Sequence, residues 1–421
     1  MTDPPLPALP ARIAALGLLE AALASRGGLD EALSAGAYLR LAARDRAFAR
    51  ALAMAALRHL GPIDRALNAR LAKEPPGAVR NILRLGAAQV FYLDTPAFAA
   101  VDTAVNLAPK ALRGLVNGVL RNLLRGDPPS DDPEALAPPW LFARWRAAYG
   151  EADARAIAAA IAREPATDLT LRDPAEEAMA PALEAQVLPG GSLRTSMRGD
   201  LAAWPGYDEG RWWVQDAAAA IPARLTGARS GQTIAELCAA PGGKSLQLAA
   251  AGAAVVAVDR SAGRLRRLTA GLKRTGLSAE IVVADAARWT DARTFDGVLL
   301  DAPCSATGGF RRNPDVLWNA RPAEIATLAA VQAGLLESAA ARVKPGGRLV
   351  YAVCSLEPEE GEAQARAFLA GHTDFVIDPI KPMEGGAPAP SLAPQGWLRI
   401  LPHHLEGDID GFFIARFARA V

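Results

Sequence analysis

Beyond Trp212, the chain alternates short apolar segments with longer amphipathic ones, and no other feature of the sequence constrains the fold as much. This alternation is typical of βαβ units, in which helices connect parallel strands and cover the sheet. We therefore predict a Rossmann-like α/β domain over residues 211–421. Its expected strands are Thr233 to Leu237, Ala254 to Val258, Glu280 to Ala284, Gly297 to Leu300 and Arg348 to Val353, with edge strands in 374–378, 397–401 and 411–418. Its expected helices lie near Lys244 to Ala251, Gly263 to Thr275, Pro322 to Val343 and Pro358 to Ala370.

The first part of the chain has a different pattern. It is rich in Ala and Leu, with apolar residues at helical spacing such as Ile13, Leu16, Leu19 and Leu23. We predict an all-α bundle of about six or seven helices over residues 1–130. The stretch Arg125 to Pro139 is rich in proline and acidic residues and predicts a linker. Residues 131–210 are expected to hold this linker and a small α+β subdomain.

Length and composition indicate a soluble globular protein of about two or three domains. The chain has 421 residues, of which 51% are hydrophobic and 22% charged. No run approaches the roughly 20 apolar residues that span a bilayer, and Met1 to Pro10 lacks the features of a secretion signal. We therefore expect a cytoplasmic protein without a membrane partner. In that reducing compartment its three cysteines are expected to be free thiols.

Charge is distributed unevenly along the chain. Residues 1–130 carry 16 Lys and Arg against 10 Asp and Glu, a net charge of +6, whereas the remainder carries 30 against 35, a net charge of −5. A basic first domain could contact a polyanion. A solvated helix surface would account for the same charge equally well.

Four successive predicted strands end in a glycine-rich turn or an acid. The first is followed by "CAAPGGK" (238–244), and the others end at Asp259, Asp285 and Asp301. Ligands bind at the carboxyl ends of the strands in open α/β sheets, and one acid there could be a turn former, but three favour a ligand site. The turn fits neither the dinucleotide nor the Walker spacing. It therefore favours a nucleoside cofactor without phosphate, such as S-adenosylmethionine.

Cys304 and Cys354 both follow predicted strands. Methylation of a pyrimidine at C5 becomes feasible once a thiolate has added at C6, and a carboxyl group near N3 would stabilise the charge on the ring. Asp301 and the two cysteines could supply these groups, but the residues alone do not choose which cysteine attacks. Free cysteine is often a small buried hydrophobe, the interpretation we keep for Cys238. No metal site is expected, because neither Cys-x-x-Cys nor clustered His occurs.

These motifs resemble the Sun family of RNA 5-methylcytosine methyltransferases. The resemblance is carried by "CAAPGGK" (238–244), "DAPCSATG" (301–308) and "CSLEPEE" (354–360), with support from "VQDAAA" (214–219), "RRNPDVLW" (311–318) and "DGFFIARF" (410–417). The front of the chain is similar to the NusB antitermination-factor fold, on "RDRAFARAL" (44–52), "AVNLAPK" (104–110) and "GLVNGVLRNLL" (114–124). The resemblance implies a NusB-like RNA-binding bundle followed by a Rossmann-like methyltransferase domain. It implies a monomer acting on small-subunit ribosomal RNA, with another RNA such as tRNA as the alternative.

The resemblance also implies roles for single residues. Cys354 would attack C6, and Cys304 would assist release of the methylated product, with Asp301 facing the cytosine. DNA cytosine methyltransferases use a Pro-Cys nucleophile, which would point to Cys304 instead; the family match favours Cys354. The chain departs from the family pattern at Val353, usually Thr, and at Glu236, usually Asp. The residues implied to bind S-adenosylmethionine are Cys238, Ala239, Ala240, Pro241, Gly242, Gly243, Lys244, Asp259, Asp285 and Asp301.

The remaining predictions concern the residues that contact RNA and two alternative functions. We expect Arg311, Arg312 and the basic face of the helical domain to contact phosphates, although the two arginines could also be an ordinary solvated pair. An N-methyltransferase would favour an Asn/Asp-Pro-Pro-aromatic loop where this chain has "DAPC" (301–304). A catalytically inactive RNA-binding module would keep the same architecture, but the presence of both cysteines and Asp301 argues against it.

Overall fold

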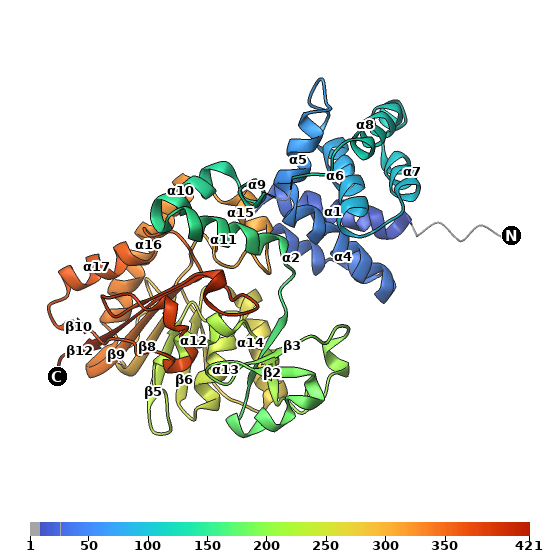
Figure 1. Ribbon diagram of the computed structural model, residues 1–421. Helices are drawn as coiled ribbons and strands as arrows, with labels where there is room; N and C mark the ends of the chain where they lie inside the picture. Colours follow the sequence, from blue (N-terminus) through green and yellow to red (C-terminus); the bar gives the residue numbers. More distant parts are fainter. Residues whose placement is uncertain (1–8, 26, 131) are drawn as a thin grey trace. The chain divides into compact units, whose positions relative to one another are not determined.

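The computed structural model describes residues 9–25, 27–130 and 132–421, and the chain forms two compact units (Figure 1). The first unit holds the chain up to Glu164 together with Phe310–Ala320, and the second holds Pro165–Gly309 and Arg321–Val421. The units therefore divide at 164, whereas the sequence predicts boundaries at 130 and 210. The start of the chain, where no secretion signal is expected, lies almost wholly outside the described residues.

The first unit is entirely helical in the part that the structure describes. Its core is formed by small and aliphatic side chains, among them Leu19, Leu52, Leu83 and Leu120. Among the described residues of the span predicted as about six or seven helices there are eight α-helices, because the short helices α2 and α3 follow Gly27 and Ala35 as separate turns. The helices are α1 Leu9–Ala24, α2 Gly28–Leu33, α3 Gly36–Leu39, α4 Ala43–Arg58, α5 Leu60–Asn68, α6 Gly77–Tyr92, α7 Ala97–Leu107, η1 Lys110–Leu112, α8 Arg113–Arg125, α9 Pro133–Leu136, α10 Pro139–Tyr149 and α11 Glu151–Ala162.

The predicted linker contains a one-turn helix. Helix α8 ends at Arg125, as expected, but α9 forms inside the stretch because the Asp132 carboxylate accepts the N–H of Glu134 at 3.2 Å and Pro133 occupies the first helical position. Helices α9 to α11 then pack with the first unit, α9 against α5. This packing moves the boundary of the unit from 130 to 164.

A segment from the second half of the sequence also belongs to the first unit. Phe310–Ala320 contains α15 (Asp315–Asn319), and the ring of Phe310 lies 6.1 Å from that of Trp145. The Asn319 amide donates to the carbonyl of Ala22 at 2.7 Å, and Arg58 donates to the carbonyl of Arg311 at 2.6 Å. The motif "RRNPDVLW" is therefore an insertion from the second half of the sequence into the helical unit.

The second unit begins with a small antiparallel sheet. Its strand order is β2-β3-β1-β4, and buried Asp168 of β1 accepts two hydrogen bonds from Arg194 of β3 at 2.7 and 2.9 Å. The strands are β1 Thr167–Leu171, β2 Ala185–Val187, β3 Leu193–Thr195 and β4 Trp212–Val214, with 3₁₀ turns η2 Pro174–Met179, η3 Pro181–Leu183 and η4 Leu201–Ala203.

The large sheet has the strand order β10-β12-β9-β8-β5-β6-β7, with β11 paired to β12. All five predicted strands are present and parallel, and the three tail segments add antiparallel strands at one edge. The strands are β5 Thr233–Leu237, β6 Ala254–Asp259, β7 Glu280–Val283, β8 Phe295–Asp301, β9 Val343–Val353, β10 Phe375–Ile377, β11 Leu398–Ile400 and β12 Phe412–Arg419. The helices are α12 Ala217–Leu225, α13 Gly243–Ala250, α14 Ala262–Thr275, α16 Pro322–Ala340 and α17 Glu362–Gly371, with 3₁₀ turns η5 Glu384–Gly386, η6 Ala389–Ser391 and η7 Pro402–His404.

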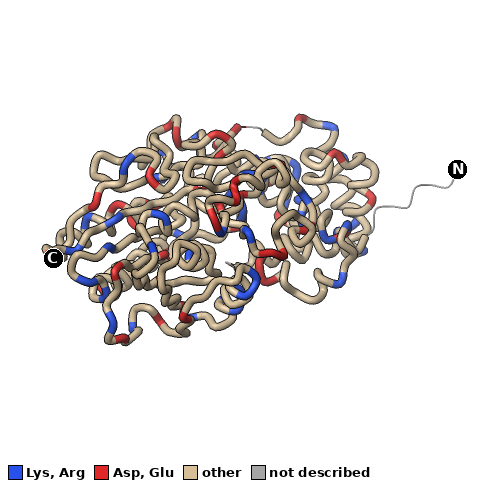
Figure 2. Tube along the Cα trace, turned by 90° about the horizontal axis from the view of Figure 1, so that it is seen from below, with Lys and Arg blue, Asp and Glu red and all other residues tan. Residues whose placement is uncertain are grey.

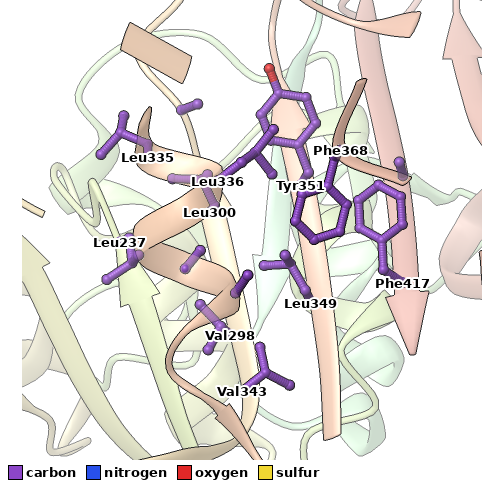
Figure 3. Packing of buried hydrophobic residues seen from close by; sticks show 14 of the residues in the cluster. Leu237, Val298, Leu300, Leu335, Leu336, Val343, Leu349, Tyr351, Phe368 and Phe417 are labelled. Carbon is purple, nitrogen blue, oxygen red and sulfur yellow. The ribbon is translucent and has the colours of Figure 1, made fainter. Parts of the chain in front are cut away.

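Both faces of this sheet are buried, which explains why its strands are apolar at nearly every position. On β9, Leu349 and Tyr351 belong to the cluster with α16 and α17, while Val350 and Ala352 pack on the opposite face with α12. Figure 3 shows Tyr351 and Leu349 gathered with Leu300, Leu336 and Phe368 in the first of these clusters. Because side chains alternate between the two faces of a strand, neighbouring residues of β9 belong to different hydrophobic cores.

Two further features concern the chain as a whole. Lys and Arg are interspersed with Asp and Glu along both units (Figure 2). No helix in the described part of the chain is long and apolar enough to cross a membrane.

Candidate active site

Three neighbouring parallel strands end at the same edge of the large sheet. Leu237 of β5 pairs with Leu300 of β8, and Asp301 pairs with Ala352 of β9. The residues that follow these strands therefore begin side by side. Because β6 lies on the other side of β5, the strand order reverses at β5, and this is the position at which open α/β sheets bind ligands.

The glycine-rich turn after β5 has a backbone that requires glycine at one position. Gly242 has φ 111°, and a Cβ there would lie 2.5 Å from the side chain of Leu268 on α14. Helix α13 begins at the next residue, so its first amides face the turn. Buried Asp259, at the end of β6, accepts the N–H of Ala240 at 3.1 Å and therefore contacts the glycine-rich turn.

Asp259 also has other partners within the chain. Its carboxylate accepts the N–H of Ser261 at 2.8 Å and a hydrogen bond from Arg264 at 3.0 Å. Asp285, after β7, is exposed and accepts the N–H of Ala287 at 3.1 Å. Both acids lie at the expected edge, and their contact with a cofactor stays a prediction.

Lys244 and Asp301 link the glycine-rich turn to the end of β8. The Lys244 Nζ lies 2.6 Å from Asp301 Oδ2, with the lysine side chain 9% exposed and the aspartate side chain 28% exposed. Burial opposes the charge of Lys244, but the carboxylate of Asp301 outweighs it, and the pKa of Lys244 is raised. The ion pair therefore holds Asp301 in place while part of its side chain remains open to a ligand.

The side chains of the two predicted catalytic cysteines are in contact. Their sulfurs are 3.5 Å apart, with Cys304 buried and Cys354 partly exposed. The contact with Cys354, together with burial, raises the pKa of Cys304. Cys238 has its pKa raised to about 12 by burial and by the carboxylates of Asp301 and Asp259. The thiolate form is thus disfavoured at Cys238, in line with its interpretation as a structural residue.

The loop that carries Cys304 is fixed by backbone contacts. Gly308 donates its N–H to the carbonyl of Cys354 at 3.0 Å and accepts the N–H of Gly411 at 2.9 Å. A Cβ at Gly308 would lie 2.1 Å from the carbonyl oxygen of Gly411. These contacts explain in physical terms why glycines occur in both "DAPCSATG" and "DGFFIARF".

Glu236 on β5 was noted in the sequence only as a departure from the family pattern. Its side chain is buried and accepts a hydrogen bond from Ser245 in the first turn of α13. Burial raises the pKa of Glu236 from 4.5 to about 8, against the opposing effects of Ser245 and Lys244. Glu236 therefore fixes the start of α13 on the strand behind the candidate ligand site.

The two arginines predicted to contact RNA differ in exposure. The Arg311 side chain is 1% exposed, so in this structure its guanidinium is not presented to a phosphate. Arg312 is partly exposed, and its contact with RNA stays a prediction. The segment that holds both residues folds with the helical unit.

Sequence reasoning also missed Glu360 and Gln332, which lie buried behind the cysteines. The only signal was the run of acids in "CSLEPEE". Among the residues that the structure describes, no group of three or more His, Cys, Asp or Glu side chains could hold a metal ion.

Comparison with known proteins defines the class. Residues 224–418 match the family model of 16S rRNA methyltransferase RsmB/F, and residues 9–125 match the NusB family. A crystal structure of a methyltransferase homolog protein from Pyrococcus horikoshii aligns with a TM-score of 0.56 and 26% identity, covering 66% of this chain and 94% of that chain. The predicted fold class, a NusB-like bundle followed by a Rossmann-like methyltransferase domain, is confirmed, as is the prediction of an S-adenosylmethionine-dependent methyltransferase.

Two relatives are similar over most of their length. Ribosomal RNA small subunit methyltransferase B of Sodalis glossinidius is 36% identical over 425 residues, covering 93% of this chain and 95% of the relative. The probable ribosomal RNA small subunit methyltransferase B of Synechocystis sp. is 36% identical over 382 residues, covering 83% and 85%. The chain belongs to the family of ribosomal RNA small subunit methyltransferase B.

Glu236→Gln should make stability less dependent on pH. The folded pKa of Glu236, about 8, exceeds its ordinary value of 4.5, so unfolding between these two values releases a proton. The wild-type protein therefore loses stability as pH rises through this window, and the variant lacks this loss. Melting temperatures measured from about pH 5 to pH 8 should fall less steeply for the variant. Equal slopes would show that Glu236 ionises normally in the folded chain.

Gly308→Ala should displace the loop that carries Cys304. The added methyl group would overlap the Gly411 carbonyl, and overpacking of this kind costs about 1–3 kcal/mol. We expect methyl transfer to fall by about tenfold or more. Gly309→Ala is the matched control, because its nearest neighbour would be at 3.5 Å, an ordinary contact. Equal activity of both variants would contradict the close approach of the two backbones.

Proposed function

We propose that this protein transfers a methyl group from S-adenosylmethionine to C5 of a cytosine in small-subunit ribosomal RNA, through a covalent bond between Cys354 and C6. One observation carries the proposal: two thiols lie 3.5 Å apart at the sheet edge that also holds the Lys244–Asp301 pair. The names of the relatives, which are small-subunit ribosomal RNA methyltransferases, support the choice of substrate. An rRNA substrate also fits the cytosolic location expected from the sequence.

The residues around the glycine-rich turn fit a nucleoside. No side chain projects from Gly242 or Gly243, and the carboxylate of Asp259 lies against the turn. Asp259 would hold the ribose hydroxyls, and the turn and the α13 amides would hold the remainder. When bound, S-adenosylmethionine supplies an electrophilic methyl group. The protein has to orient that group toward the base and exclude water.

The order of steps follows from the chemistry of the pyrimidine ring. The Cys354 thiolate adds to C6, which makes C5 an enamine carbon able to take the methyl group. Transfer of the C5 proton to a base or to water then allows the ring electrons to expel the Cys354 sulfur, so the thiolate is regenerated. Asp301, held by Lys244, would face N3 of the cytosine and stabilise the charge that develops on the ring.

Cys304 is suited to assist Cys354 rather than to attack. Its pKa is raised, so it keeps its proton near neutral pH and can donate a hydrogen bond to the Cys354 sulfur 3.5 Å away. A proton donor beside the Cys354 sulfur would stabilise that sulfur as it leaves C6. This arrangement supports Cys354 as nucleophile and Cys304 as the residue that assists release.

The substrate must present an accessible base. A cytosine inside a helix hides its C6 face, so the enzyme would act on a loop or on a flipped base. We propose that the NusB-like unit and Arg312 hold phosphates of the RNA and that the protein acts as a monomer. Methylation of tRNA instead of rRNA is the alternative that the same site chemistry would allow.

The direct test is methylation of small-subunit rRNA that lacks the modification. With labelled S-adenosylmethionine, we expect label at C5 of one or more cytosines in rRNA and none in a tRNA pool. Label in tRNA alone would refute the substrate, and the absence of label at cytosine C5 in both would refute the enzymatic proposal.

Substitution of the two cysteines should have different effects. Cys354→Ala should lower methyl transfer by more than about 10³-fold, as expected for loss of a catalytic nucleophile. Cys304→Ala should accumulate a protein–RNA adduct that survives denaturing electrophoresis, because release is slowed. The double variant is the control and should form no adduct. An adduct in Cys354→Ala would reverse the assigned roles.

Arg312→Ala should weaken RNA binding through loss of a phosphate contact. We expect the slope of log affinity against log salt concentration to become smaller by about 1. Arg293→Ala is the control, because Arg293 precedes β8 at the opposite edge of the sheet and pairs there with Glu280. A slope equal to that of the wild-type protein would place Arg312 outside the RNA interface.

A further inference from the structure

One carboxyl group lies between the two loops that carry the cysteines. Glu360 is fully buried, at 0% exposure, and belongs to the second unit, as do both loops. None of the roles described above involves it. Its surroundings consist of polar groups from three separate parts of the chain, so its placement needs an explanation beyond hydrophobic packing.

The carboxyl group of Glu360 makes four hydrogen bonds. Its Oε1 accepts the N–H of Ser305 at 2.8 Å and the side-chain amide of Gln332 at 3.1 Å. Its Oε2 lies 2.5 Å from the hydroxyl of Ser305 and 2.5 Å from the hydroxyl of Ser355. Ser305 directly follows Cys304, and Ser355 directly follows Cys354. One side chain therefore joins the two residues next to the two thiols.

The groups around Glu360 also fix its position. The Tyr351 hydroxyl, on β9, donates to the Glu360 backbone carbonyl at 2.6 Å. Gln332 on α16 donates to the carbonyl of Pro303, the residue before Cys304, at 2.9 Å. The backbone of Glu360 is not helical, because α17 begins only at Glu362, after a turn in which the Glu360 N–H bonds to Glu357. This turn is what directs the side chain inward.

We infer that Glu360 is a positioning residue that holds the sulfurs of Cys304 and Cys354 in contact. The inference rests on the proposed function for its catalytic meaning. It goes beyond that function because Glu360 has no step in the proposed reaction and bonds to Ser305 and Ser355, the residues that follow the two thiols. Other bonds also join the two loops, such as the one from the Gly308 N–H to the Cys354 carbonyl, and Glu360 adds a link to the residue directly after each thiol.

The contact chemistry favours a carboxyl group at this position. The Ser305 N–H and the Gln332 amide N–H can only donate, and both serine hydroxyls approach the other oxygen. Glutamine has the same shape but replaces that oxygen with a donor. The serine hydroxyls can accept from this donor, but each then loses the carboxyl oxygen as the acceptor for its own proton, and a buried donor without an acceptor costs more than the net value of the bond. Glu360→Gln should therefore weaken the link between the loops with little change in volume.

The test measures the distance between the thiols directly. Phenylarsine oxide binds tightly only where two sulfurs can bridge one arsenic, so its affinity for the full chain reports their contact and requires neither RNA nor methyl transfer. We expect the affinity to fall by about tenfold or more in Glu360→Gln, as for loss of a charge-assisted hydrogen bond. In steady-state assays kcat should fall while KM for RNA stays within about twofold, because the residue acts after binding.

Two further variants separate positioning from loss of stability. Asp168→Asn removes a carboxylate that is equally buried but lies in the small sheet, paired with Arg194. It should lower the melting temperature and leave arsenical affinity unchanged. Ser355→Ala should lower arsenical affinity more than Ser305→Ala, because Ser305 keeps its backbone N–H bond to Glu360 after loss of its hydroxyl.

The outcomes distinguish this inference from the proposed function. If Glu360→Gln binds phenylarsine oxide as tightly as the wild-type protein, or if Asp168→Asn loses as much affinity, the positioning role is wrong whatever reaction the enzyme catalyses. If arsenical affinity falls as expected but no cytosine is methylated by the wild-type protein, the positioning role stands and the proposed reaction fails.

Discussion

The pairing of β8 with β9 is the constraint on which the active site depends. Asp301 is opposite Ala352 in this pair, so both chains leave the sheet at the same level, and Cys304 and Cys354 follow within three and two residues. A shift of one residue would turn the side chains of β9 to the other face of the sheet. The side chains of Tyr351 and Val353 would then point into the core that holds Val350 and Ala352. Burial of both faces of the sheet thus sets the register that brings the sulfurs together.

Much of this arrangement could be predicted from the sequence, because strand ends carry a clear signal. Apolar runs that end at Asp259, Asp301 and Val353 located the edge, and parallel strands bring such ends together. The inward direction of Glu360 could not be predicted in the same way. The segment from Pro358 has a helical pattern, whereas a non-helical turn precedes α17. Which cysteine attacks came from family resemblance, since both follow strand ends in an equivalent manner.

The burial of Arg311 shows a second limit of sequence reasoning. Two adjacent arginines next to a catalytic motif favour RNA contact, but their role depends on where the segment packs. Here Arg58 donates to the carbonyl of Arg311, and Asn319 donates to that of Ala22, which are contacts between residues very far apart in the sequence. Such long-range pairs leave no periodic signal. The loop that carries Cys304 is consequently fixed at one end by β8 and continues at the other into a segment folded with the helical unit.

The three cysteines differ in the surroundings and in the exposure of their thiols. Burial and two nearby carboxylates raise the pKa of Cys238, and contact with the second thiol raises that of Cys304. Cys354 is the partly exposed member of the pair, and it lies against a thiol that keeps its proton. A nucleophile needs access to its substrate, and Cys354 is the more exposed of the two thiols. This difference in exposure favours the proposed assignment of Cys354 as the nucleophile, which the sequence supported through family resemblance.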